Sequence, residues 1–142
     1  MQMRSYLSTR MQYQHKALLE MLDGLSDELI RQRTIPGKWS IFETIVHLQT
    51  YQHVFCERMK KILEEDTPSF PRYIADTDPV FLENCGKTIR EIMKDMITLR
   101  KEMSTGSLAL FETQLARTGT HPVFGSMTIE QWLNFFLLHE DQ

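Results

Sequence analysis

The chain has 142 residues and a formal net charge of −3 at pH 7, with 42% hydrophobic and 25% charged residues. This length suits a single domain, residues 1–142, that buries its own core, and the composition excludes a disordered chain. The basic residues are scattered, with no run longer than a pair, so neither nucleic acid nor an anionic membrane is expected as a partner.

The sequence shows no feature of export or membrane insertion. Its first residues contain no apolar segment of the kind that a secretory signal requires, and no stretch approaches the roughly 18 apolar residues of a membrane span. We therefore expect a cytoplasmic protein. Cys56 and Cys85 belong to no CxxC pair, so both are interpreted as free thiols that serve as small apolar side chains.

The first helix is predicted from about residue 3 to residue 23. Its stripe residues recur every three or four positions and so share one face of a helix; they are Leu7, Met11, Gln14, Leu18, Met21 and Leu25. A short helical turn is predicted at residues 26–31, because the Ser26 hydroxyl can cap an amide two or three residues later. The Pro-Gly pair that follows breaks the chain.

The second helix is predicted from Ser40 to about Glu64. Ser40 and Glu43 have the spacing of a capping box, in which each side chain accepts a hydrogen bond from the other residue's amide. The stripe is of bundle length and consists of Ile41, Ile45, Leu48, Gln52, Phe55, Met59 and Ile62. Residues 65–77 contain two prolines and no stripe. Fully extended they can span about 40 Å, which allows a crossover between parallel helices.

The third helix is predicted as one continuous element from Asp78 to about Gly106. Asp78 is a suitable cap, and proline at the next position fits the first turn. The stripe consists of Leu82, Cys85, Ile89, Ile92, Met96, Leu99 and Met103. A short extra helix is predicted within residues 107–116, and residues 117–126 are interpreted as a loop because of their glycine and proline content.

The fourth helix is predicted after Thr128, which has capping-box spacing with Gln131. Its apolar face consists of Ile129, Trp132, Leu133, Phe136 and Leu137. Because the sequence ends at Gln142, this helix is about half as long as the second and third. We therefore expect either that the chain continues or that another subunit covers part of their stripes. Four helices without strand-like alternation predict an all-α four-helix bundle.

Histidines are the candidates for chemistry, because a Gly-rich phosphate loop, a GxSxG elbow and an HExxH motif are all absent. His15 and His53 lie next to stripe positions and are interpreted as boundary or surface residues without a role. His121 precedes a proline in the predicted loop, where it could contact a ligand near the mouth of the bundle, although a solvated loop histidine is the favoured interpretation. The remaining two histidines lie on the second and fourth helices.

His139 shares the aromatic face of the last helix, seven residues after Trp132, and a buried imidazole there needs a partner. His47 lies beside the stripe of the second helix and can reach the interior edge. Each histidine alone is more often a hydrogen-bonded core residue than a ligand. Together they can bind one zinc or nickel ion, which needs a third ligand. The candidates by position for that ligand are Glu43, Glu140 and Asp141.

Two blocks of the sequence resemble the DinB-like superfamily. In residues 38–59, Trp39 and Ser40 open a helix and His47 is followed by leucine, as in the family. Residues 125–142 resemble the family's last helix, in which a Gly-containing turn, a Thr, a Trp-Leu pair and a His occur in that order. The resemblance implies a four-helix bundle with up-down-down-up topology, consistent with the two long connections.

The resemblance also implies a divalent metal site, with nickel or zinc as the cofactor. In the family the ligands are a histidine at the position of His47 and two histidines four residues apart on the last helix, of which His139 is present here. Characterised relatives include transferases and isomerases that use low-molecular-weight thiols. We therefore expect a metal-dependent enzyme, a thiol-dependent S-transferase or a related hydrolase, that acts on a small electrophilic substrate.

Two alternatives stay open at this point. One is a non-catalytic bundle that forms a homodimer or binds a partner helix through its uncovered stripe. The other is a binder of apolar small molecules, with Phe135, Phe136 and His139 at the edge of its pocket.

Overall fold

The computed structural model describes residues 5–141 of the chain. Its helices are α1 (Ser5–Tyr13), α2 (Lys16–Leu22), α3 (Asp27–Arg31), α4 (Ile41–Glu64), α5 (Pro79–Asn84), α6 (Ile89–Leu108), α7 (Glu112–Leu115) and α8 (Ile129–Asp141). A 3₁₀ turn, η1 (Ala75–Thr77), and two strands, β1 (Thr118–His121) and β2 (Gly125–Thr128), complete the structure.

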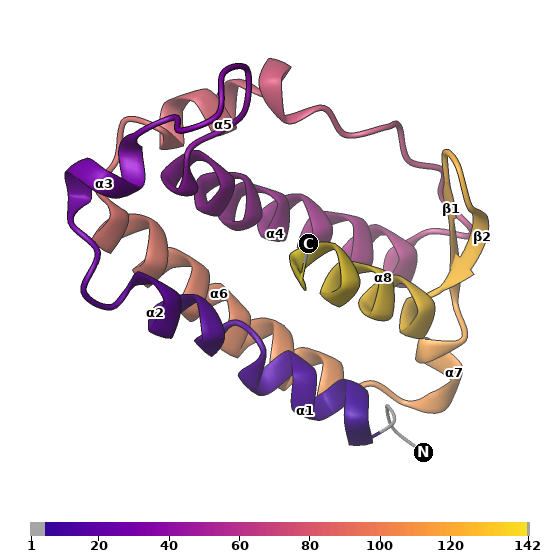
Figure 1. Cartoon of the computed structure of the whole chain (residues 1–142). Helices are drawn as coiled ribbons and strands as arrows, with labels where there is room; N and C mark the ends of the chain where they lie inside the picture. Colours follow the sequence, from indigo (N-terminus) through magenta and orange to yellow (C-terminus); the bar gives the residue numbers. More distant parts are fainter. Residues whose placement is uncertain (1–4, 142) are drawn as a thin grey trace.

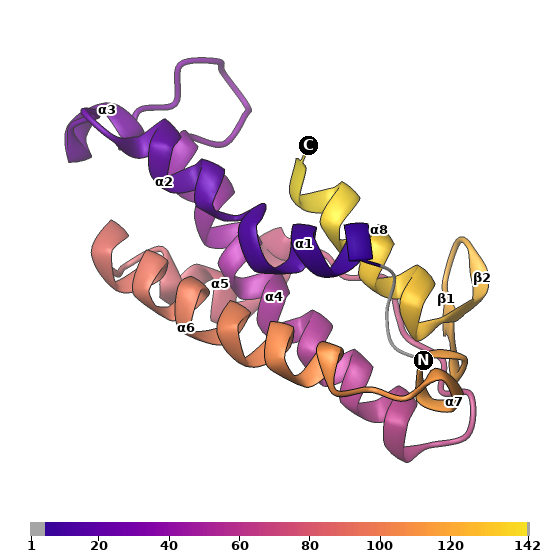
Figure 2. The same cartoon turned by 90° about the horizontal axis from the view of Figure 1, so that it is seen from below.

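Four helical segments form the bundle, which confirms the predicted all-α class. They are α1 with α2, then α4, α6 and α8, and we call them the bundle segments. Figure 1 shows that α1 and α2 run toward one end, α4 and α6 both run back, and α8 returns. This order is the expected up-down-down-up topology, and the chain between α4 and α5 provides the crossover that two parallel helices require. Helix α1 contacts both α6 and α8; Figure 1 shows it alongside α6, and Figure 2 shows it next to α8.

Helix α4 begins where its capping box predicts. The Ser40 hydroxyl accepts from the Glu43 amide at 3.1 Å, and the Glu43 carboxylate accepts from the Ser40 amide at 2.9 Å. Arg33 also pairs with this carboxylate, which lowers the pKa of Glu43 to about 2. Thr128 and Gln131 form the same reciprocal pair at the start of α8. Both local predictions are confirmed.

The prediction of one continuous first helix is wrong at Gln14 and His15. The chain makes a turn there before α2 begins, in which the carbonyls of Gln14 and His15 accept from the amides three residues later. Gln14 instead uses its side chain to donate to the Leu137 carbonyl at 2.9 Å and to Glu140 at 3.0 Å. These hydrogen bonds join segments far apart in the sequence, so the spacing of apolar residues within the first helix does not predict them. Residues 3 and 4 of the predicted helix lie outside the described residues.

The prediction of one continuous third helix is also wrong, because the helix is interrupted between α5 and α6. Asp78 caps α5 as predicted, by accepting from the Val80 amide at 2.9 Å. Buried Asn84 then donates to two side chains of α4, and Thr88 caps the new helix by accepting from the Glu91 amide at 3.1 Å. The Thr88–Glu91 spacing is itself a capping signal that the long stripe obscured. Helix α6 also continues past Gly106.

The segment interpreted as a loop at residues 117–126 contains a β-hairpin instead. Strands β1 and β2 pair antiparallel, and the Phe70 amide donates to the Thr120 carbonyl at 3.1 Å. The indole of Trp132 donates to the Gly119 carbonyl at 3.2 Å. These short strands lack apolar alternation, so their pairing depends on neighbours far away in the sequence. The short extra helix in this connection is α7.

Connecting segments cover the half of α4 that the short helix α8 does not reach. One core cluster gathers around Trp132, Phe55 and Phe136 beside α8. The second joins Val46 of α4 to residues of α3, α5, α6 and η1, where Ile30, Ala75, Phe81 and Met96 are buried. Part of the apolar stripe of α4, which was expected to be left uncovered, is therefore buried by other segments of the same chain.

Two glycines provide a matched test of this packing. A Cβ on Gly119 would lie 2.7 Å from the Ile62 side chain and 2.9 Å from Phe70, whereas a Cβ on Gly106 meets nothing within 4 Å. We expect Gly119→Ala to lower the free energy of unfolding by about 1–3 kcal/mol through overpacking. Gly106→Ala should raise it by about 0.5–1 kcal/mol, because alanine favours a helix interior. Urea unfolding of both variants measures this, and equal effects would contradict the packing described.

Candidate metal and substrate cavity

A cavity of about 580 Å³ opens between α4, α8, the connection that follows α4, and the β-hairpin. Its size lies within the range of small-molecule sites. Aromatic side chains form much of its wall, contributed by Trp39, Tyr51, Tyr73 and Phe135. Phe136, which was predicted to edge a pocket, is buried in the core against Phe55 at 4.6 Å between ring centroids.

His47 from α4 and His139 from α8 meet in this cavity. Their Nε2 atoms are 3.4 Å apart, and their rings are nearly perpendicular at 74°. Trp39 contacts the His47 ring at 5.2 Å between centroids, and Tyr51 contacts the His139 ring at 5.0 Å. The two histidines are thus held in place by aromatic neighbours while one nitrogen of each points to the same spot.

Burial keeps both imidazoles neutral at pH 7. It lowers the pKa of His47 to about 4, with a further contribution from His139 and an opposing one from Asp76. Burial likewise lowers the pKa of His139, against the nearby charge of Glu140. A neutral imidazole has a free lone pair, which is the form that binds a metal ion.

The geometry of this pair fits a divalent ion. Two nitrogens that each lie about 2.0–2.1 Å from one tetrahedral ion are about 3.3 Å apart, close to the 3.4 Å between the Nε2 atoms of His47 and His139. A direct hydrogen bond between them would be long, since N–H donors usually approach to about 2.9–3.0 Å. The spacing of the pair is therefore the spacing expected of two nitrogens that share one ion.

The carboxylates predicted as a third ligand have other partners. Glu43 is used by its capping box and by Arg33, as described above, and Glu140 is paired with Arg100 and Gln14. The side chain of Asp141 lies outside the part of the structure that is described. Within residues 5–141, no group of three His, Cys, Asp or Glu side chains is placed to hold a metal. Neither Glu43 nor Glu140 is therefore grouped with the histidine pair.

His121 lines the cavity, which was the less favoured of its two interpretations from the sequence. It ends β1, lines the same cavity, and packs against Trp132 and Phe135 with ring centroids 5.4 and 5.2 Å away. Its Nδ1 accepts from the amides of Val123 and Phe124 at 3.0 and 3.1 Å. The proton of the neutral ring is therefore on Nε2, which makes His121 a hydrogen-bond donor. Only the hairpin, which was not predicted, brings it to the cavity.

Two arginines make the cavity wall basic. Arg58 is nearly fully buried and donates through Nη2 to the Pro71 carbonyl at 2.8 Å, while its guanidinium lies 5.4 Å from the Phe70 ring. Arg72 is a second cation in the wall, and among the described residues no Asp or Glu side chain lines the cavity. The cavity therefore favours an anionic ligand.

The remaining predictions for histidines and cysteines have mixed outcomes. His53 is exposed and bonds to Asp95 at 2.6 Å, as expected for a surface residue. His15 was expected near the surface but is buried, with 3% of its area exposed. Cys56 and Cys85 are free thiols, and burial raises the pKa of both, to about 12 for Cys56. Neither thiol is a nucleophile at neutral pH.

Comparison with known proteins identifies the family. The sequence model of the DinB superfamily matches residues 10–142. The chain belongs to the DinB superfamily. It is similar to YuaE of Bacillus subtilis, with 29% identity over 131 residues that cover 84% of this chain and 81% of YuaE.

A solved structure supports the fold. The chain superposes on YfiT from Bacillus subtilis with a TM-score of 0.82 and 16% identity, covering 96% of this chain and 78% of YfiT. YfiT is described as a probable metal-dependent hydrolase with an unusual four-helix bundle topology. At this identity the likeness shows the fold. Within residues 5–141, none of the helices has the length and apolar character needed to cross a membrane.

Burial of His15 predicts a specific pH dependence of stability. Burial, then the charges of Arg100 and Lys16, lowers its pKa to about 4 in the folded protein, against 6.5 when unperturbed. Between these pH values the unfolded chain binds a proton that the folded protein does not, so the free energy of unfolding falls as pH falls. We expect His15→Gln to remove about 2 kcal/mol of that fall. Urea unfolding at pH 7 and pH 4 measures it, and an unchanged fall would contradict the assignment.

Proposed function

We propose that this DinB protein is a divalent-metal-dependent enzyme that holds nickel or zinc at His47 and His139. The observation that carries the proposal is the 3.4 Å separation of two neutral, cavity-facing imidazole nitrogens. The description of YfiT as a probable metal-dependent hydrolase supports the same class of chemistry. When bound, such an ion lowers the pKa of a water or thiol, so that a nucleophile exists at neutral pH.

The protein side chains would bind and orient an anionic substrate. Arg58 and Arg72 offer cationic guanidinium groups to a carboxylate or phosphate, and His121 offers an N–H donor. A small electrophile with an acidic group fits this arrangement.

We favour a thiol as the nucleophile, and thus S-transfer as the reaction. The two cysteines are protonated at neutral pH and neither lines the cavity, so a reactive sulfur would have to enter with a low-molecular-weight thiol. Such thiols commonly carry carboxylates, for which the basic wall is suited. In S-transfer a sulfur–carbon bond forms while the leaving group departs with the electron pair of its own bond. Hydrolysis, with water in place of the thiol, uses the same side chains.

Metal content tests the proposal with a matched pair of histidine variants on α4. We expect titration of the purified wild-type protein with nickel or zinc to saturate at one ion per chain, with water completing the coordination because the described residues supply two protein ligands. His47→Ala should lose at least about 100-fold in affinity, because one of the two ligands is gone. His53→Ala, which removes an exposed histidine outside the cavity, should bind as the wild type does. Elemental analysis and calorimetry give the measurement.

The outcomes separate metal binding from reaction type. A wild-type protein without a stoichiometric ion, or equal loss in both variants, would overturn the metal site. For the loaded protein, consumption of glutathione with an activated aryl chloride indicates S-transfer, with chloride as leaving group. Release of nitrophenol from an ester without thiol indicates hydrolysis instead.

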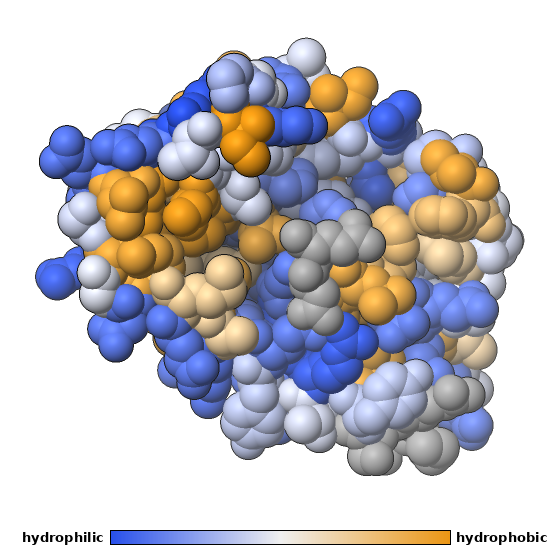
Figure 3. All heavy atoms as spheres, viewed as in Figure 1, coloured by the Kyte–Doolittle hydropathy of each residue, from blue (hydrophilic) through white to orange (hydrophobic). Residues whose placement is uncertain are grey.

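A second candidate function is a homodimer or partner-binding module, favoured by one specific surface. Exposed apolar side chains gather on α2, α3 and the turn between them, and Figure 3 shows apolar surface over this region. They are Leu19, Met21, Leu25 and Leu29. Patches of this kind often mark an interface.

Sedimentation over a range of protein concentrations tests the second candidate. A homodimer through this surface should dissociate more readily in Met21→Glu, since Met21 is 69% exposed and a charge there would be buried on association. Phe111→Glu, at an exposed apolar residue away from α2 and α3, is the control. A wild-type monomer at every concentration would exclude the homodimer.

A further inference from the structure

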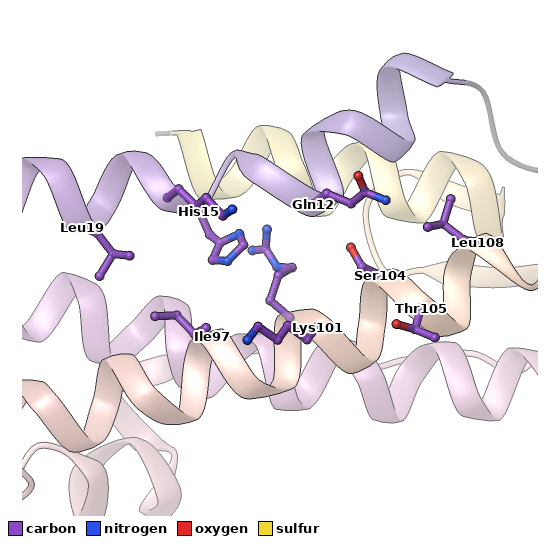
Figure 4. A pocket seen from close by; sticks show the side chains of 10 residues that line it. Gln12, His15, Leu19, Ile97, Lys101, Ser104, Thr105 and Leu108 are labelled. Carbon is purple, nitrogen blue, oxygen red and sulfur yellow. The ribbon is translucent and has the colours of Figure 1, made fainter.

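A second cavity lies on a different side of the bundle, between the α1–α2 segment and α6. Its volume is about 410 Å³, and it shares no lining residue with the cavity at His47. Figure 4 shows the His15 imidazole reaching from the upper helices toward α6, and the Ser104 hydroxyl reaching from α6 toward them.

Three buried polar atoms from this wall have no hydrogen-bond partner within residues 5–141. They are Nδ1 of His15, Nη1 of Arg100 and Oγ of Ser104. The three residues are 3%, 0% and 8% exposed. Buried polar groups are nearly always satisfied in folded proteins, and water or a ligand fills the gap where the protein does not. Three such atoms beside one cavity indicate a polar occupant.

Arg100 is held in one orientation by its other nitrogens. Its Nε donates to Gln52 at 2.9 Å, and its Nη2 donates to Glu140. The guanidinium therefore cannot turn to satisfy Nη1 without losing these contacts. A fixed donor with an unused N–H edge is suited to a carboxylate oxygen.

The charges and the apolar walls define what kind of occupant fits. Arg100, Lys16 and Lys101 line the cavity, and no described Asp or Glu does. Leu19, Ile97 and Leu108 supply the apolar part of the wall. The charge of Arg100 is already paired with Glu140, so the uncompensated positive charge of the wall is that of Lys16 and Lys101. Water would satisfy the hydrogen bonds but would compensate neither these two charges nor the apolar walls.

We propose that this cavity binds a small organic carboxylate with a short apolar chain. Its carboxylate would lie at Arg100, Ser104 and His15, and its chain along the apolar wall. Lys16 and Lys101 add attraction for the negative charge from the exposed side. The site does not depend on the metal site proposed above, because the two cavities have separate walls.

Hexanoate is the probe, with hexanamide as its uncharged match. We expect hexanoate to bind the full chain with a Kd of about 1 mM, as is typical for a ligand of this size. The NMR signals of His15, Lys101 and Ser104 should shift during the titration. Ser104→Ala should weaken binding about fivefold through the lost hydroxyl donor. Lys101→Gln should weaken it about threefold.

The matched control is Lys94→Gln, at an exposed lysine seven residues earlier on α6 that does not line the cavity. It should bind hexanoate as the wild type does. Equal binding of hexanoate and hexanamide would show an apolar cavity without recognition of the acid, and would overturn the proposal. So would the absence of shifts at about 10 mM hexanoate, ten times the expected Kd, or equal weakening by the two lysine variants.

Discussion

The interior of the bundle is organised around one buried ion pair. Arg100 on α6 is fully buried and donates through Nη2 to the carboxylate of Glu140 on α8. Gln52 on α4 accepts from the same guanidinium, and Gln14 after α1 donates to Glu140. This network therefore joins all four bundle segments. Taking two charges out of water costs several kcal/mol per ion unless each is well paired, so alternative registers of the helices that separate the pair are strongly disfavoured.

The same pair determines how α8 presents His139. Consecutive residues on a helix are separated by about 100° around its axis. With Glu140 turned toward Arg100, its neighbour His139 faces the cavity and meets His47. The capping box of Ser40 and Glu43 determines where α4 begins, and His47 follows on the same helix. A structural ion pair and a local cap thus place the two candidate ligands, although neither takes part in the proposed chemistry.

Both cavities are basic in a chain whose net charge is −3. Arg58 and Arg72 line one, and Lys16, Arg100 and Lys101 line the other, while the carboxylates near them are engaged in caps and ion pairs. The net charge of the whole chain therefore does not predict the charge of the ligands that these cavities favour. Burial also keeps the imidazoles of His15 and His47 neutral, so that hydrogen bonding or metal binding replaces charge at these positions.

Features that depend on neighbours in sequence were predictable. The capping boxes at Ser40 and Thr128, the cap at Asp78 and the inward direction of His139 all follow from spacing within one or two helical turns, and the family-like blocks indicated the topology. The sequence by itself determined the class of fold and the identity of the histidine pair that meets.

Features that depend on contacts between distant segments were decided only by the tertiary structure. The break at Gln14 follows from hydrogen bonds to α8, and the hairpin at β1 follows from contacts with Phe70 and Trp132. Glu140 was a candidate ligand by position, but Arg100, forty residues away, takes its carboxylate. The physical reason is that a buried polar group requires a partner, and the sequence shows the requirement without showing which distant residue satisfies it.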